Sequence, residues 1–163
     1  MMSKNVEDAL NGQLNAELFS AYLYMSMAAY FESITMTGMA KWMRLQAQEE
    51  HGHAMKFFEF IVDQGGRVKL TAIGAPETEW ASPLAAFQAA FAHEQKVTGL
   101  IGDLVELAKD EGDTAAGIFL QWFVTEQVEE EKGTNEIVQK LKLAKEAAPE
   151  LLMLDAVLGR RGE

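Results

Sequence analysis

Residues 46–60 read QAQEEHGHAMKFFEF, and they show a pattern that recurs through the whole chain. Apolar residues within and just before this stretch, Met43 and Phe57 included, fall at steps typical of one face of an α-helix. Glu50 and His53 occupy that same face, where a helix packed in a core would carry further apolar side chains. Burying a carboxylate without a partner costs free energy, so a positively charged group or ion must compensate the charge on this face.

The same interruption occurs in three other segments with helical periodicity. The pattern predicts four long helices, at about 6–32, 39–65, 82–109 and 113–145. Each predicted helix carries an acid near the middle of its apolar face: Glu17, Glu50, Glu94 and Glu130. Together these carboxylates carry a charge that two divalent metal ions would neutralise. The pattern therefore predicts a two-metal site inside a helical bundle.

The spacing of the polar residues shows a degenerate internal repeat. Glu17 and Glu50 lie 33 residues apart, as do Glu94 and Gln127. A shift of 77 residues superposes Glu17 on Glu94, Glu49 on Glu126, Glu50 on Gln127 and His53 on Glu130. The repeat predicts two similar helical hairpins, related by a pseudo-twofold axis, whose ligands meet at one point.

The connections predict an all-α four-helix bundle in a single domain, residues 1–163, with the bundle at about 5–145. Residues 33–38 and 110–114 are short connections, so each joins two antiparallel helices. Residues 65–81 are a longer connection, and about 16 extended residues span roughly 50 Å. A helix of about 27 residues is only about 40 Å long. We therefore expect this segment to cross the full length of the bundle and to make the second and third helices parallel.

A short fifth helix is predicted at about 149–158, beginning at Pro149. Leu151, Leu154 and Leu158 fall on one face of it. Because the apolar faces of the four long helices are complete without this helix, we expect its apolar face to be buried in an oligomer. The alternative is that the fifth helix folds back on its own bundle.

The composition limits the classes of partner. The chain has 25 acidic and 14 basic residues and a formal net charge of −11, which argues against nucleic acid and anionic membranes. No uncharged stretch, 18–31 included, reaches the roughly 18 residues that a membrane-spanning helix needs. The first residues lack the apolar core of a signal peptide, and without cysteine there is no disulfide and no thiolate ligand. We therefore expect a cytoplasmic protein.

Single residues in this pattern have ordinary alternatives. A histidine such as His53 is often a hydrogen-bonded core residue. Tyr24, seven residues after Glu17, is equally well interpreted as a core side chain or as a redox partner. His51 and His93 have no partner at ligand spacing, and we interpret them as structural. The metal hypothesis therefore rests on the whole constellation and not on any one residue.

Taken together, the four helices, the long crossover and the buried acids resemble the non-haem ferritins of bacteria and archaea. Ferritin-like di-iron bundles take one glutamate from each of two helices and Glu-x-x-His from the other two. Glu17 and Glu94 match the single glutamates, and residues 50–53 form one Glu-x-x-His. The fourth helix carries Gln127 and Glu130 instead, which matches ferritins rather than bacterioferritins or rubrerythrins.

The resemblance implies a centre for two iron ions. Glu17 and His53 would bind one ion. Glu94 and Glu130 would bind the other, with Glu50 as the bridge between them. Mixed carboxylate and imidazole ligands suit non-haem iron, with manganese or zinc able to compete.

Further residues have implied roles around this centre. Gln127 would hydrogen-bond beside the ligands, and we include Tyr24 in the predicted catalytic set as a redox partner. The residues that match a third iron site are Glu49, Glu126 and Glu129, with Glu130 shared. His51 stands where bacterioferritins carry a haem-binding methionine, so haem is not expected.

The resemblance also implies an activity and a set of partners. Ferritins are ferroxidases that oxidise iron(II) to iron(III) with dioxygen or hydrogen peroxide. They store the product as a ferric mineral inside a hollow homo-oligomeric shell of twenty-four subunits. The expected partners are therefore iron(II), the oxidant and other copies of the chain.

Two other functions remain open on the sequence. A rubrerythrin-like di-iron peroxidase would use similar ligands without storing iron, and it would retain two irons per chain rather than hundreds per particle. A purely structural bundle with its acids at the surface would show no stoichiometric iron(II) binding by calorimetry.

Overall fold

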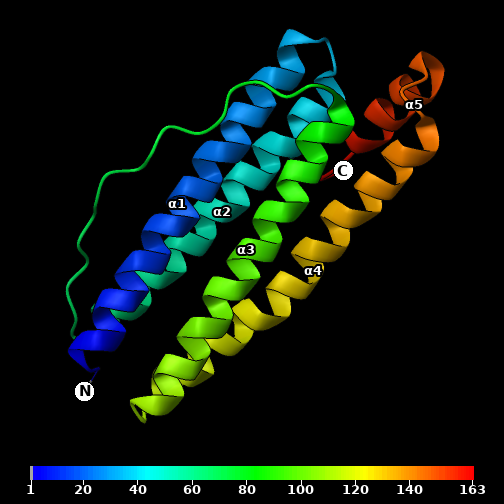
Figure 1. The fold of residues 1–163 in the computed structure, drawn as a ribbon. Coiled ribbons are helices and arrows are strands. Elements are labelled where there is room, and N and C mark those ends of the chain that lie inside the picture. The colour runs from blue at the N-terminus through cyan, green and yellow to red at the C-terminus, as the bar shows by residue number, and fades with distance from the viewer. Residues whose placement is uncertain (1) are drawn as a thin grey trace.

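The computed structural model describes residues 2–163, and every regular element in that range is a helix (Figure 1). The helices are α1 (Lys4–Ser33), α2 (Thr37–Asp63), α3 (Pro83–Asp110), α4 (Thr114–Ala144) and α5 (Ala148–Leu158). The four long helices form an elongated bundle, and α5 lies at the end where α4 finishes (Figure 1). The predicted all-α four-helix bundle is confirmed. Within the described range, no helix combines the length and the apolar character that crossing a membrane requires.

Capping side chains determine where two of the long helices begin. Ser82 Oγ accepts a hydrogen bond from the Ala85 N–H at 3.1 Å. Pro83 occupies the first position of α3, where a backbone N–H has no helical partner in any case. Asp113 Oδ1 accepts from the Ala116 N–H at 3.0 Å at the start of α4. Both caps lie at the residues where the sequence pattern predicted these helices to begin.

The connection between α2 and α3 runs along the outside of α1 for the length of the bundle (Figure 1). α2 and α3 are therefore parallel, as the length of this segment predicted. The Asn11 amide of α1 donates to the Arg67 carbonyl at 3.0 Å and accepts from the Lys69 N–H at 2.6 Å. Farther along α1, Ser26 Oγ donates to the Glu77 carbonyl at 2.6 Å. Side chains of α1 thus satisfy backbone groups of the extended segment and hold it against the bundle.

The interior of the bundle consists of two apolar clusters with a polar layer between them. The cluster at the α5 end includes Phe31, Met39, Met43, Phe87 and Leu141. The cluster at the opposite end includes Leu10, Phe57, Ile101, Leu120 and Phe123. Between these clusters each long helix contributes buried polar residues instead of apolar ones. The apolar layers therefore isolate the middle of the bundle from water at both ends.

The fifth helix packs on its own bundle, which corrects the expectation that it needs an oligomer to bury its leucines. Leu158 is buried in the cluster at the α5 end, and Leu151 and Leu154 pack against that cluster. Asp155 anchors the helix from the same side. Its carboxylate accepts hydrogen bonds from the first turn of α2, from the Met39 N–H at 2.8 Å and the Gly38 N–H at 3.2 Å. Met36, the residue before α2, makes no side-chain hydrogen bond to the first turn of this helix. Asp155 of α5 therefore supplies the cap.

Gly38 is predicted to be required for this docking. A Cβ atom there would lie 1.9 Å from the Asp155 carbonyl oxygen, which is backbone and cannot rotate away. We expect Gly38→Ala to lower the free energy of unfolding by about 1–3 kcal/mol, because α5 must shift. The control is Gly12→Ala in α1, where a Cβ meets nothing within 4 Å. Denaturant unfolding compares the two variants, and equal stabilities would contradict the inferred clash.

Candidate metal centre

Six buried polar residues form the polar layer at mid-height of the bundle, called the central layer below. They are Glu17 of α1, Glu50 and His53 of α2, Glu94 of α3, and Gln127 and Glu130 of α4. None of the six is more than 8% exposed. Each interrupts an apolar face, as the sequence pattern indicated, and the bundle brings all four faces to one level.

The ligand atoms of the central layer form two adjacent groups that share one carboxylate. Glu17, Glu50 and His53 make up the first group, in which the candidate ligand atoms lie within 4.8 Å of one another. Glu50, Glu94 and Glu130 make up the second group by the same measure. His53 Nδ1 faces the first group, at 3.2 Å from Glu50 Oε2 and 3.9 Å from Glu17 Oε2. Glu50 is therefore placed to bridge two metal ions.

Two buried glutamines that the sequence analysis did not assign to the site hold its carboxylates. Gln13 Nε2 donates to Glu17 Oε1 at 2.8 Å. Gln46 Nε2 donates to Glu50 Oε1 at 3.3 Å and to Glu130 Oε2 at 2.6 Å. Each glutamine precedes a ligand by four residues and so shares its helix face. That spacing was the available signal.

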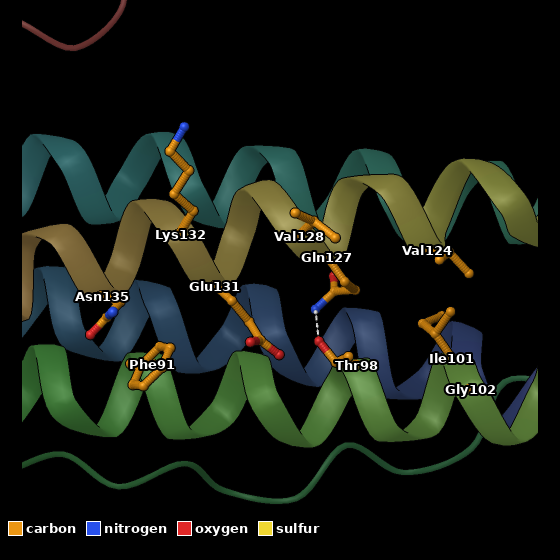
Figure 2. Close-up of a pocket in the computed structure, with 10 residues that line it drawn as sticks. All are labelled: Phe91, Thr98, Ile101, Gly102, Val124, Gln127, Val128, Glu131, Lys132 and Asn135. Carbon is orange, nitrogen blue, oxygen red and sulfur yellow. Dashed lines mark hydrogen bonds between the residues drawn. The ribbon is translucent and has the colours of Figure 1, made fainter.

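Glu94 is held from two sides. The Tyr24 hydroxyl, fully buried, donates to Glu94 Oε1. Gln127 Nε2 donates to Glu94 Oε2 at 3.2 Å and to Thr98 Oγ1 at 3.3 Å, and Figure 2 shows the second of these bonds. Gln127 also lines a groove of about 570 Å³ between α3 and α4, together with apolar residues such as Phe91. Gln127 therefore separates this groove from a candidate ligand.

Burial raises the pKa of all four central carboxyl groups. The pKa of Glu17 rises well above its ordinary value because of burial and then the charge of Glu50. Burial and the charges of Glu94 and Glu130 raise the pKa of Glu50 in the same way. For Glu130, burial and then the charge of Glu94 raise the pKa to about 7. The central layer therefore holds protons near neutral pH, and dications are the natural replacement for them.

One oxygen atom in this layer has no partner among residues 2–163. Glu17 Oε2 is buried and accepts no hydrogen bond, whereas Glu17 Oε1 is bonded to Gln13. It points towards the imidazole of His53 at 3.9 Å, with Glu50 beside it. A buried oxygen without a donor is costly unless a cation binds it. This orphaned atom, in a set of carboxylate and imidazole donors, fits a site for iron.

The three acids expected at a third site lie in different surroundings. Glu126 joins His53 and Glu130 in a further group of candidate ligands, and its Oε1 lies 3.9 Å from His53 Nε2. Glu49 forms an ion pair with Arg161 at 2.7 Å. Glu129 is exposed, and no candidate metal group in the described range includes it. The structure thus brings Glu126 to the centre and leaves Glu49 and Glu129 at its edge.

The other two histidines are not candidate ligands. Ser20 Oγ lies 2.7 Å from His93 Nε2, and burial lowers the pKa of His93 to about 4. His51 is exposed. Instead, an aromatic side chain that the sequence analysis did not single out borders the centre: the ring centroid of Trp122 lies 5.4 Å from that of His53.

Comparison with known proteins agrees with this geometry. The family model described as Ferritin-like domain matches residues 7–144. The chain is 42% identical over 161 residues to a bacterial non-heme ferritin of Bacteroides fragilis, covering 99% of this chain and 100% of that relative. It is 37% identical to a bacterial non-heme ferritin of Staphylococcus aureus, covering 99% and 97%. An open pore ferritin from the archaeon Archaeoglobus fulgidus superposes with a TM-score of 0.98 at 53% identity, covering 99% of each chain.

These findings confirm the resemblance to ferritins on which the expected function rested. The similarity to the two bacterial relatives and the archaeal structure extends over nearly the full length of the chain. The residues that could hold metal lie inside the matched range. The chain therefore belongs to the ferritin family, whose members store iron and oxidise iron(II).

Proposed function

We propose that this chain oxidises iron(II) at the central layer and that a hollow shell of twenty-four copies stores the product as a ferric mineral. The observation that carries the proposal is the pair of ligand groups that share Glu50. Family membership supports the same activity. The cytoplasmic location expected from the sequence stays a prediction.

Iron(II) is the substrate in this proposal. Two iron(II) ions each give up one electron, and dioxygen takes the two electrons and two protons to become hydrogen peroxide. Peroxide can serve as the oxidant in the same way, taking two electrons and two protons to become two water molecules. Glu17 and His53 hold one ion, Glu94 and Glu130 hold the other, and Glu50 contacts both. The oxidant thus meets two one-electron donors at one place.

The amide and phenol donors orient the ligands before iron arrives. Gln13 and Gln46 leave one oxygen of their carboxylate partners free to face the centre. Tyr24 and Gln127 instead hold both oxygens of Glu94, with the Tyr24 hydroxyl bonded to Oε1 and the Gln127 amide bonded to Oε2. We assign Tyr24 a positioning role on this geometry, because its hydroxyl bonds a ligand directly.

Oxidation changes the balance of charge at the centre. Four carboxylates match two iron(II) ions, but two iron(III) ions leave an excess of two positive charges. Glu126 is an additional acid that forms a candidate ligand group with His53 and Glu130 of the centre. We assign Glu126, with Glu49 and Glu129 beyond it, to the path by which iron leaves the central layer. This third-site role is part of the proposal.

Assembly into a shell is supported by the outer face of α5. Leu152, Met153 and Val157 of α5 are exposed, and Met153 and Val157 line a hollow between α5 and α4. Leu143 of α4 lies in the same hollow region and is 81% exposed. A contiguous apolar surface of this kind is typical of an interface between subunits. A second copy of the chain is the partner that the family suggests.

Particle size and iron content test the proposal together. Light scattering is expected to show a particle of about twenty-four times the 18.0 kDa chain mass. After aerobic loading, the purified particle is expected to retain far more iron than two ions per chain. Retention of only two ions per chain would favour the rubrerythrin-like peroxidase instead. A monomer or dimer at micromolar concentration would contradict the shell.

A further inference from the structure

The last residues of the chain, 159–163, follow α5 and lie against α2. Lys41 Nζ of α2 donates to the Gly159 carbonyl at 2.9 Å and forms an ion pair with Glu163 at 3.3 Å. Gly162, at φ +84°, turns the chain beside Leu45. We call residues 159–163 the C-terminal tail. Its contacts place it on the side of α2 that carries Glu49.

Arg161 is the centre of these contacts. Its Nη2 donates to Glu49 Oε2 at 2.7 Å, and its Nη1 donates to the Trp42 carbonyl at 3.1 Å. The guanidinium group also lies over the Trp42 ring, with Cζ 4.4 Å from the ring centroid. The planar fork and the stacking together fix the guanidinium in one place, which lysine would not achieve. The guanidinium of Arg161 is therefore held in one position, with 23% of the side chain exposed.

Glu49 connects this cation to the segment of α2 that carries Glu50. It immediately precedes Glu50 on α2, and its charge is among the causes that raise the pKa of Glu130. The acid is thus close enough to the centre to act on a ligand electrostatically. Its Oε2, however, is bonded to the tail and not to the centre. Glu49 can compensate a metal ion fully only if it gives up part of its bond to Arg161.

We infer that Arg161 is a positioning residue that competes with an additional metal ion for Glu49, so that filling this position loosens the C-terminal tail. The inference rests on the proposed function, since it takes Glu49 as an acid that serves metal beyond the first two ions. Coupling of this kind is reciprocal: if Arg161 weakens metal binding at Glu49, metal at Glu49 weakens the contact with Arg161 by the same factor. Arg161 therefore holds Glu49 until the first two metal positions are filled.

Zinc(II) binding to the assembled protein tests the competition without any redox step. Calorimetry is expected to resolve two tighter ions per chain and a weaker additional one. Arg161→Gln is expected to tighten the additional ion about three- to tenfold, the scale of one ion pair strengthened by stacking, and to leave the first two unchanged. Arg160→Gln is the matched control, because it removes the same charge from the adjacent, exposed position.

Hydrogen exchange of the C-terminal peptide gives a second readout that does not depend on affinity. Zinc(II) in excess of two ions per chain is expected to speed exchange at residues 159–163 in the parent. In Arg161→Gln and in Glu49→Gln, exchange is expected to be fast already and independent of zinc. Glu49→Gln tests the pair from the other side, and Arg161→Lys is expected to lie between Arg161→Gln and the parent.

The outcomes separate the two proposals. Equal affinity for the additional ion in the parent and in Arg161→Gln would overturn the competition. Hydrogen exchange at residues 159–163 that does not change with zinc(II) in the parent would also overturn the competition. Failure of every variant to bind the first two ions would instead count against the proposed central-layer site.

Discussion

Replacing Glu50 with alanine is expected to abolish rapid oxidation of iron(II). Glu50 is the one residue common to the two central ligand groups, so its loss removes an oxygen ligand from both positions at once. We expect the initial rate in stopped flow, at two iron(II) ions per subunit, to fall by at least about 100-fold. His53→Ala removes a ligand from the first group only, and its effect is expected to be large but smaller.

Glu59→Ala is the matched control for this experiment. Glu59 is an acid on the same helix, but it is exposed and belongs to no candidate ligand group in residues 2–163. Its rate is expected to equal that of the parent. If Glu50→Ala and His53→Ala also oxidise iron(II) at the parent rate, the reaction takes place elsewhere in the molecule.

The stability of the metal-free protein is expected to fall as the pH rises. Burial raises the pKa of the central carboxyl groups in the folded state, while the unfolded chain keeps values near 4.5. The folded state therefore binds more protons than the unfolded state between these values, so the free energy of unfolding decreases with pH. For Glu130 the window extends from about 4.5 to about 7, and the raised pKa values of Glu17 and Glu50 change the stability in the same direction. Urea unfolding of dissociated subunits across this range measures the slope.

Removing two of these charges is expected to stabilise the metal-free protein and to remove its activity. In Glu17→Gln combined with Glu94→Gln, desolvation and repulsion of the remaining carboxylates are reduced. We expect the melting temperature at neutral pH to rise by a few degrees, the effect of roughly 1 kcal/mol per subunit. Zinc(II) is expected to raise the melting temperature of the parent, because it binds the folded state alone, and to leave that of the variant nearly unchanged.

A surface variant separates this effect from a change in net charge. Glu59→Gln combined with Glu106→Gln removes the same two charges from exposed positions on α2 and α3. Its melting temperature is expected to stay within about a degree of the parent, since exposed charges contribute little. A central-layer variant that melts below the parent in metal-free buffer would show that these acids do not form a cluster held together by metal.

The helices and the central layer were predictable because both depend on local spacing. A helix repeats about every 3.6 residues, so the chain itself indicates which side chains share a face. Glu17, Glu50 and Glu94 stand out because each occupies a position at which its own helix otherwise carries apolar residues. The long connection between α2 and α3 was predictable for a similar reason, since its length alone required a parallel arrangement.

The hydrogen-bond partners of Gln13 and Gln46 were not predictable from the sequence. Their spacing from Glu17 and Glu50 was visible, but a glutamine on a buried face has many possible partners. Gln46 Nε2 lies 2.6 Å from Glu130 of α4, 84 positions away, and 3.3 Å from Glu50 of its own helix. Which acceptor it meets depends on how two helices are rotated against each other, and periodicity within one helix carries no information about that rotation.

The end of the chain depended on three-dimensional packing altogether. Periodicity identified the apolar face of α5, but not the surface that covers it. Asp155 meets Met39 from 116 positions away, and Arg161 meets Glu49 from 112 positions away. Both contacts exist because the uncapped start of α2 and the exposed acid beside Glu50 lie where the chain turns back after α4. Groups so distant in sequence pair only after the bundle has fixed their positions. No local sequence pattern could therefore predict these two contacts.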